Sequence, residues 1–138
     1  AQIRGHFLHL DHATDTRQAT RAVLEGVAFA FADCRDALAG TGTQIASALA
    51  IGGGAKSDYW LKVLATTLGF PLHVPAAGDF GAALGAARLG MMAATGADMS
   101  IATTPPIAKS IEPDLSLASE FAAAHARYRS AYSLLKDL

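Results

Sequence analysis

The 138-residue sequence contains a single cysteine, Cys34. A lone thiol has no partner in the chain for a disulfide, and it cannot form a zinc site built from cysteines. Sparse cysteine is typical of proteins that work in a reducing compartment, so we expect a cytoplasmic location.

Neither sign of charge is in excess, because 11 Lys and Arg stand against 12 Asp and Glu, and the formal net charge is -1. This balance provides no electrostatic attraction to nucleic acid or to an anionic membrane, so we expect neither as a partner. The sequence also lacks an apolar run long enough to span a membrane and a start that reads as a signal peptide. Its apolar content of 51% is instead that of a folded chain.

Periodicity in the first third of the chain predicts a strand and a long helix. Residues 5–10 alternate enough to predict a short strand. Asp15, with Gln18 three residues later, has the pattern of a capping box. Apolar residues then recur at helical spacing: Ala19, Ala22, Val23, Val27, Ala30, Phe31, Cys34 and Leu38. Gly40 is expected to end this helix at the C′ position.

Two further strands and a second helix follow. Residues 46–51 form a short apolar run that predicts a buried strand, and residues 71–75, bounded by prolines, predict another. Ser57 is expected to cap the helix between them, and Gly69 to end it. One stripe of that helix is apolar: Trp60, Leu61, Leu64, Ala65 and Leu68.

The last third begins with a helix of very small residues over 80–92, whose backbone we expect to pack close to a neighbour. Asp79 precedes it, and we favour a capping role over a catalytic one. Residues 95–114 read as a loop with a short strand at 107–111. An amphipathic helix over 117–135 ends the chain. Its apolar face consists of Leu117, Phe121, Ala124, Tyr128, Tyr132 and Leu135.

The order of these elements, in which strands alternate with helices, predicts an α/β fold. In such folds ligands bind at the carboxyl ends of strands, and the loop "GGGAKS" at 52–57 follows one such end. A Walker A loop is excluded, because Ala50 and Ala55 stand at its two glycine positions. A Rossmann fingerprint is excluded too, because its third glycine falls on Ser57.

Two interpretations of this loop remain open. Glycines without Cβ would let a ligand lie against the backbone, and the following helix offers free N–H groups. Alternatively, the glycines serve only a strand-to-helix turn that requires positive φ.

Other chemistry is weakly indicated. His6, His9 and His12 cluster near Asp11, but residues 6 and 9 of a strand point to opposite faces, so we expect no metal site. The chain has serine, aspartate and histidine residues but no context typical of a hydrolase.

Three segments together resemble the C-terminal portion of the FGGY-type carbohydrate kinases, and within that family the xylulokinases in particular. They are "GHFLHLDH" with "RAVLEGVAFAFAD", then "AIGGGAKSDYWLKVLATTLGFPL", then "GDFGAALGAARLG". Their order and spacing agree with the family over nearly the whole chain. His9 departs from the glycine usual there, and Ala19 from a larger apolar residue.

The resemblance implies a kinase with two actin-like (ribonuclease H-like) domains and a cleft between them. Such enzymes use ATP and Mg²⁺ to phosphorylate a sugar hydroxyl, here of D-xylulose, with ribulose, gluconate or glycerol as alternatives. By matching positions, residues 52–58 are the adenosine motif. Gly54 would touch the purine nucleoside, Asp58 would lie near the base, and Gly52, Gly53 and Ala55 would complete the loop.

The resemblance also implies that this chain is a fragment, because the catalytic Asp, the sugar contacts and the phosphate loops belong to upstream segments. Only one strand precedes the first helix where an actin-like domain has three. We therefore expect an incomplete actin-like domain at 1–97, with a loop and an appended helix at 98–138 packed on it. Alone it should be inactive. The missing N-terminal domain would bind most of the sugar, and a homodimer is allowed. A non-catalytic actin-like module for assembly or regulation is the alternative of another class.

Overall fold

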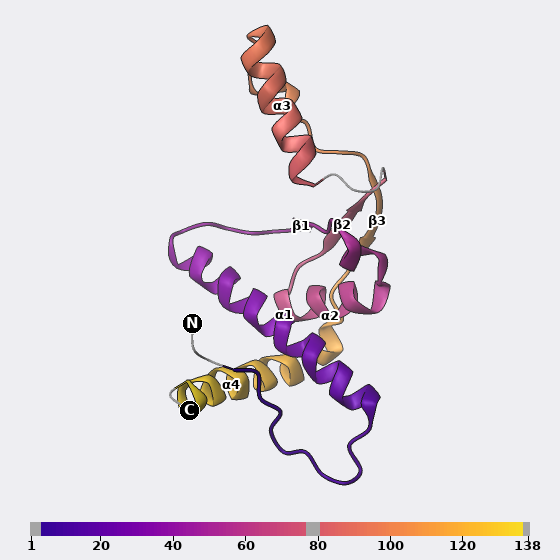
Figure 1. Cartoon of the computed structure of the whole chain (residues 1–138), viewed down its shortest axis with the longest axis vertical. Helices are drawn as coiled ribbons and strands as arrows, with labels where there is room; N and C mark the ends of the chain where they lie inside the picture. Colours follow the sequence, from indigo (N-terminus) through magenta and orange to yellow (C-terminus); the bar gives the residue numbers. More distant parts are fainter. Residues whose placement is uncertain (1–3, 77–80, 137–138) are drawn as a thin grey trace.

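The computed structural model describes residues 4–76 and 81–136 (Figure 1). The helices are α1 (Thr16–Gly40), α2 (Asp58–Leu68), α3 (Ala82–Thr95) and α4 (Ala118–Leu135). The strands are β1 (Ala48–Leu49), β2 (Leu72–Pro75) and β3 (Ile107–Ile111). Short 3₁₀ turns cover Gly53–Lys56, Met99–Ile101 and Leu115–Leu117. The predicted cap Asp79 lies outside the described residues.

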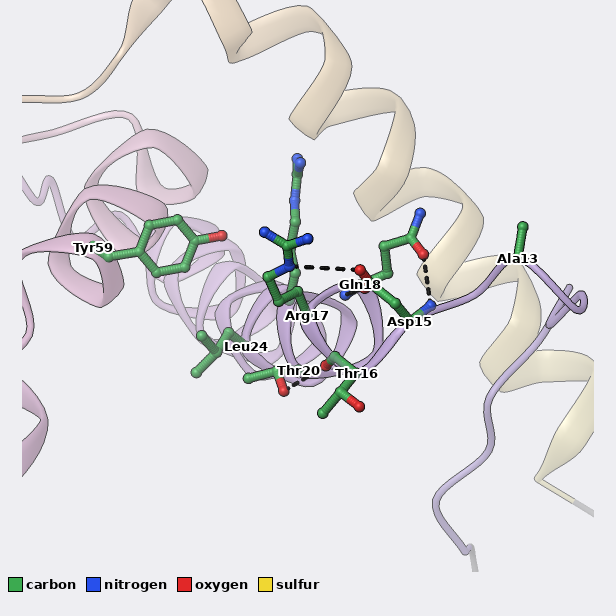
Figure 2. A pocket seen from close by; sticks show the side chains of 9 residues that line it. Ala13, Asp15, Thr16, Arg17, Gln18, Thr20, Leu24 and Tyr59 are labelled. Carbon is green, nitrogen blue, oxygen red and sulfur yellow. Dashed lines mark hydrogen bonds and ion pairs between the residues drawn. The ribbon is translucent and has the colours of Figure 1, made fainter.

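The predicted start of α1 is confirmed and its predicted end is wrong. The Asp15 carboxylate accepts from the Gln18 N–H at 2.8 Å, and the Gln18 side chain accepts from the Asp15 N–H at 2.8 Å (Figure 2). At the other end the helix includes Gly40, and the residue with positive φ is Gly42, at +88°. Two more residues therefore pass before the chain turns.

The strand predicted at 5–10 does not form, and this segment has no regular structure. His9 has a φ of +58°, and it is the one non-glycine with positive φ among residues 4–76 and 81–136. Residues that have a side chain rarely adopt this backbone conformation, whereas glycine adopts it without strain. The segment therefore holds one residue, His9, in a conformation that glycine would adopt at less cost.

The three strands form one sheet in the order β1-β2-β3. β1 pairs with β2 in parallel, and β3 pairs with β2 in antiparallel. The strands predicted at 71–75 and 107–111 are thus both present, as β2 and β3. β1 is shorter than the predicted run 46–51, and Leu49 is 43% exposed rather than buried. Because β1 and β2 are parallel, their carboxyl ends share one edge, from which the glycine loop departs.

The core consists of two clusters joined by α2. On one side Val63 packs with Ala28, Phe29 and Phe121. On the other side Leu61 and Ala65 pack against residues of the sheet and of the segment before it, which include Phe70 and Leu72. The predicted stripe on α2 is confirmed, since all its members are buried or half-buried. Val63 and Thr66, outside the stripe, are buried as well.

The apolar stripe predicted on α1 is not the face that this helix buries. Its buried residues are Ala28, Phe29 and Ala32, whereas Val23 and Phe31 from the predicted stripe are 51% and 52% exposed. α1 has apolar residues on two faces, and α2 and α4 cover only one of them. The spacing of apolar residues in the sequence identified one apolar face of α1. It could not show that α2 and α4 pack on the other face.

The small residues of α3 do not produce the predicted close packing. Figure 1 shows α3 at the opposite end of the molecule from α4. None of its residues is buried, and a Cβ added at Gly85 or Gly90 would meet nothing within 4 Å. Within the described residues, its small side chains therefore serve no close contact. No described helix is both long and apolar enough to cross a membrane.

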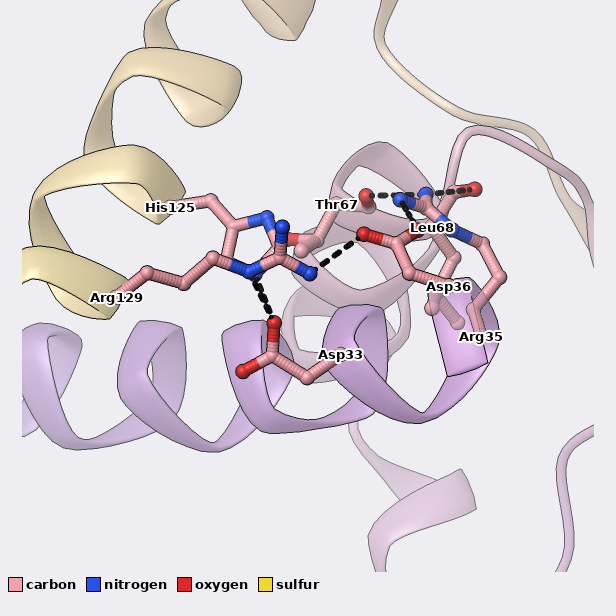
Figure 3. Close-up of polar contacts among 7 residues, drawn as sticks. All are labelled: Asp33, Arg35, Asp36, Thr67, Leu68, His125 and Arg129. Atoms are coloured by element: carbon pink, nitrogen blue, oxygen red, sulfur yellow. Dashed lines mark hydrogen bonds and ion pairs between the residues drawn. The ribbon is translucent and has the colours of Figure 1, made fainter. Parts of the chain in front are cut away.

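α4 buries part of its predicted apolar face, but Tyr132 on that face is 54% exposed. Charged groups fasten α4 to α1 (Figure 3). The Asp33 carboxylate contacts His125 Nε2 at 2.8 Å and accepts from Arg129 Nε at 2.5 Å. Arg129 also donates to Asp36 at 2.7 Å. Under these contacts the His125 ring stacks on Phe29, with ring centres 5.6 Å apart. Polar and aromatic contacts thus fix the same two helices in one register.

A second guanidinium extends the contacts to α2. Arg35 donates to Asp36 at 2.6 Å and to the carbonyl oxygens of Thr67 and Leu68 at 3.2 and 2.8 Å (Figure 3). These carbonyls belong to the last turn of α2, where a cation is favoured by the helix dipole. The hydrogen bond from Arg35 lowers the pKa of Asp36, although burial opposes the shift. We call Asp33, Arg35, Asp36, His125 and Arg129 the charge cluster.

The lowered pKa of Asp36 predicts that acid weakens the fold. A carboxylate whose folded pKa lies below its unfolded value of about 3.9 contributes stability above that pH and loses it as pH falls through the folded pKa. Asp36→Asn should therefore lower the free energy of unfolding at pH 7 and flatten its decline between about pH 5 and pH 3. Urea denaturation at a series of pH values measures both effects.

Arg35→Met removes the same hydrogen bond from the other side and should flatten the decline in the same way. A decline as steep in both variants as in the unaltered protein would contradict the role given to this pair.

Candidate functional site

The glycine loop leaves the carboxyl end of β1 and turns at once into α2. Pairing with β2 continues one residue past β1, where the Ala50 N–H donates to the His73 carbonyl at 2.8 Å. The loop then closes through Ala55 N–H to the Gly52 carbonyl at 3.1 Å and Ser57 N–H to the Gly54 carbonyl at 3.2 Å. This compact turn places the backbone of three glycines at the surface.

The three glycines have different physical reasons to be glycine. Gly52 has φ +80° and ψ -173°, a region that is essentially restricted to glycine. A Cβ at Gly54 would lie 3.2 Å from Trp60 Nε1, a tight contact, so the half-buried indole favours glycine there. Gly53 has no positive φ, and a Cβ on it would meet nothing within 4 Å. The chain's own structure therefore gives no reason for glycine at 53, and close approach of a ligand is a reason that would.

The two interpretations of the loop thus apply to different residues. The turn interpretation accounts for Gly52, and internal packing accounts for Gly54. Gly53 is the loop glycine that neither reason explains, so it gives the ligand interpretation its strongest support. Sequence spacing treats the three glycines as equivalent, and the geometry separates them.

The start of α2 forms the other side of the site. Ser57 caps the helix as predicted, because its Oγ accepts from the Trp60 N–H at 3.2 Å. The N–H groups of Asp58 and Tyr59 in the first turn lack an acceptor inside the helix. Such a terminus, beside a glycine loop, attracts negatively charged ligand groups.

The structure brings all five predicted site residues to this end of α2. Gly52, Gly53, Gly54 and Asp58 are exposed, and Ala55 is half-buried. Asp58 differs from the expectation in one respect, because its carboxylate already contacts an ammonium group, Lys109 Nζ on β3. Nothing in the sequence indicated that residues 51 positions apart would meet here.

An open groove lies beside the start of α2, between Tyr59 and the first turns of α1 (Figure 2). Arg17 and Arg21 line it together with Tyr59. None of the loop glycines does. Arg21 is held by Glu25 one turn later at 2.5 Å, and this hydrogen bond raises the pKa of Arg21. Sequence reasoning missed these three residues, although arginines four apart on one helix face are a readable signal.

The charge cluster is the one grouping of potential metal ligands among residues 4–76 and 81–136. Ligand atoms of Asp33, Asp36 and His125 lie within 4.8 Å of one another. Two guanidinium groups, from Arg35 and Arg129, already balance the two carboxylates. A metal ion would have to displace Arg129, so the cluster is better explained as a structural contact between helices.

One family of known proteins matches the first two thirds of the chain. The sequence profile of the "FGGY family of carbohydrate kinases, C-terminal domain" matches residues 1–94. The charge cluster extends beyond this match, because two of its members belong to α4.

Two relatives and one solved structure are similar to this chain over nearly its whole length, including α4. The xylulose kinase of Escherichia coli (strain K12) is 37% identical and that of Klebsiella pneumoniae 34% identical, each over 99% of this chain and 29% of the relative. The crystal structure of a "xyloylose kinase from Brucella ovis" matches 99% of this chain and 28% of its own, with a TM-score of 0.91 and 51% identity.

The present chain therefore spans less than a third of the length of each of these proteins. Its fold agrees with what the quoted sequence segments indicated. The chain belongs to the FGGY family of carbohydrate kinases.

Proposed function

We propose that this chain is the nucleotide-binding C-terminal part of a sugar kinase that transfers the γ-phosphoryl group of ATP to D-xylulose. Family membership supports the reaction class, and the names of the relatives support the sugar. The observation that carries the nucleotide site is Gly53, a glycine that the chain's own packing does not require. It lies at the carboxyl end of a strand, where ligands of α/β folds bind.

The residues present fit a purine nucleoside. Gly53 leaves open space for a flat ligand to approach the backbone, and Gly54 lies directly on the edge of Trp60. The first turn of α2 offers N–H groups. In this arrangement Gly52 and Ala55 shape the loop, Gly53 and Gly54 contact the nucleoside, and Asp58 lies near the base.

The loop and the start of α2 offer few ligands for Mg²⁺ and for the phosphates of ATP. Asp58 is the only acidic residue between 48 and 68, and its partner is Lys109. We propose that Mg²⁺ is held by the ATP phosphates and by residues outside the chain. The metal ion would neutralise charge that develops on the transferred phosphoryl group.

The chain's own part in the reaction is positioning. Phosphoryl transfer depends on groups that hold the phosphate from both sides, and the described residues supply only the nucleoside side. The catalytic base and most sugar contacts are proposed to come from an N-terminal domain. We therefore expect the isolated chain to be inactive, and the complete enzyme to act in the cytoplasm, where ATP is supplied.

The sugar is tested by a substrate panel. The full-length polypeptide should phosphorylate D-xylulose with a higher kcat/KM than ribulose, gluconate or glycerol, measured by coupled ADP release. Preference for another member of the panel would replace the proposed substrate. No turnover of any member, with no ADP bound, would favour a non-catalytic actin-like module.

A carboxylate in the loop should prevent nucleotide binding. Gly54→Asp places a negative side chain beside Trp60 and in the proposed path of the nucleoside, and we expect ADP binding to be lost in the full-length protein. Isothermal titration measures it, and the melting temperature without nucleotide checks that the variant is folded. Gly40→Asp, a surface glycine at the end of α1 with no atom within 4 Å of an added Cβ, is the control. Unchanged ADP affinity in Gly54→Asp would contradict the assignment.

A pair of alanine substitutions separates the ligand role from the turn role. Gly52→Ala should cost about 1–3 kcal/mol of stability, because alanine does not tolerate the backbone conformation there. Gly53→Ala should leave stability unchanged or raise it by up to about 1 kcal/mol. Its methyl group should nevertheless weaken ADP binding about tenfold, as expected for overpacking of a contact.

Urea denaturation and ADP titration of both variants give the four numbers needed. If Gly53→Ala bound ADP as tightly as the unaltered protein, the nucleoside would not approach the loop at that residue.

A further inference from the structure

We propose that Lys109 is a positioning residue of the nucleotide site, acting through Asp58. The proposal rests on the proposed function, since it assigns a new part to the same site. Lys109 lies outside the stretch that matches the family, residues 1–94. The site would then be completed by a strand that follows this stretch.

The sheet fixes where Lys109 stands. β3 pairs with β2 so that Lys109 lies opposite Val74 and Ile111 opposite Leu72. Alternate residues of a strand share a face, so Lys109 and Ile111 are on the same side of the sheet. Ile111 packs into the core cluster that contains Leu61 of α2. Lys109 is therefore on the face that α2 covers, displaced from Ile111 toward the carboxyl edge of β2.

Three polar contacts then connect α2 to β3 and the chain after it. Asp58, Lys62 and Thr66 are four residues apart and therefore lie along one face of α2. Asp58 contacts the Lys109 ammonium, Lys62 Nζ donates to the Glu112 carbonyl at 2.9 Å, and Thr66 Oγ1 accepts from the Asp114 N–H at 3.0 Å. We call these contacts the α2–β3 ladder.

The ladder runs from the protein interior to the glycine loop. Thr66 is 7% exposed, whereas the Asp58 side chain, next to Ser57 and the loop, is 68% exposed. An exposed ion pair adds little to stability by itself. The first contact of the ladder therefore has little structural value, and of the three contacts only that of Thr66 is part-buried.

The contact has two consequences for a ligand at the loop. A carboxylate held by an ammonium group occupies fewer orientations, and its second oxygen can accept a hydrogen bond from a nucleoside amine or hydroxyl. The ammonium also offsets the negative charge that Asp58 places at a helix N-terminus, which would otherwise repel an anionic nucleotide. Lys109 thus makes Asp58 compatible with the ligand.

Lys109→Met in the full-length polypeptide tests this assignment by ADP and adenosine titration. We expect the dissociation constant for ADP to rise about tenfold, the size of one lost charge-assisted contact. Lys109→Arg keeps a cation and should restore affinity to within about twofold of the unaltered protein. Lys62→Met removes the same charge from the second contact of the ladder, and it should leave ADP affinity unchanged when measured on folded protein.

Coupling distinguishes positioning from direct contact. If Lys109 acts through Asp58, the double variant Lys109→Met, Asp58→Asn should bind ADP no more weakly than Asp58→Asn alone. Additive losses in the double variant would mean that Lys109 contacts the ligand itself and would overturn the proposal. Equal losses in Lys109→Met and Lys62→Met would reduce both to structural contacts and overturn it as well.

A different result would contradict the proposed function than would contradict the role of Lys109. Absence of ADP binding in the unaltered full-length protein would count against the nucleotide site as a whole. Tight ADP binding there, with Lys109→Met unchanged and folded, would overturn only the role of Lys109.

Discussion

The structure depends on the burial of α2 on two sides. Val63 faces the cluster formed with α1 and α4, and Leu61 faces the cluster formed with the sheet. A helix buried in this way fixes both neighbours relative to itself, because close-packed interiors leave little room for adjustment. The glycine loop and Asp58 are attached to its first turn. The position of the candidate site is thus set by the same contacts that hold the fold together.

Polar contacts at both ends of α2 also connect this helix to its neighbours. At its carboxyl end Arg35 joins the last carbonyls to the charge cluster, and at its amino end Asp58 meets Lys109. The first arrangement neutralises two carboxylates with two guanidinium groups beside a stacked histidine. The second is exposed and adjoins the loop. Similar ionic contacts therefore serve different purposes, because the first joins side chains of α1 and α4 into a network whereas the second is a single pair beside the loop.

Local sequence signals predicted most helix caps, apart from the end of α1, but predicted the neighbours of the elements poorly. Asp15 with Gln18, Ser57 and Gly69 all act as expected, since a cap depends on residues within one turn. The strands at 71–75 and 107–111 and the final helix were also predicted, because their apolar patterns are local as well. The strand at 5–10, the buried face of α1 and the close packing of α3 were wrong, because each depends on what lies beside the element. The Lys109–Asp58 contact is equally non-local, and the sequence held no sign of it. The position after a strand singled out the glycine loop in the sequence, but only the geometry distinguished Gly53 from Gly52 and Gly54.

The central claim is that a nucleoside lies against the loop and the start of α2. Photolabelling of the full-length protein with an azido-adenine nucleotide, followed by mass spectrometry of its peptides, tests this most directly. The account predicts that the label is attached within residues 52–60 and that excess ADP prevents it. Labelling that ADP prevents but that maps wholly to other segments would contradict the account.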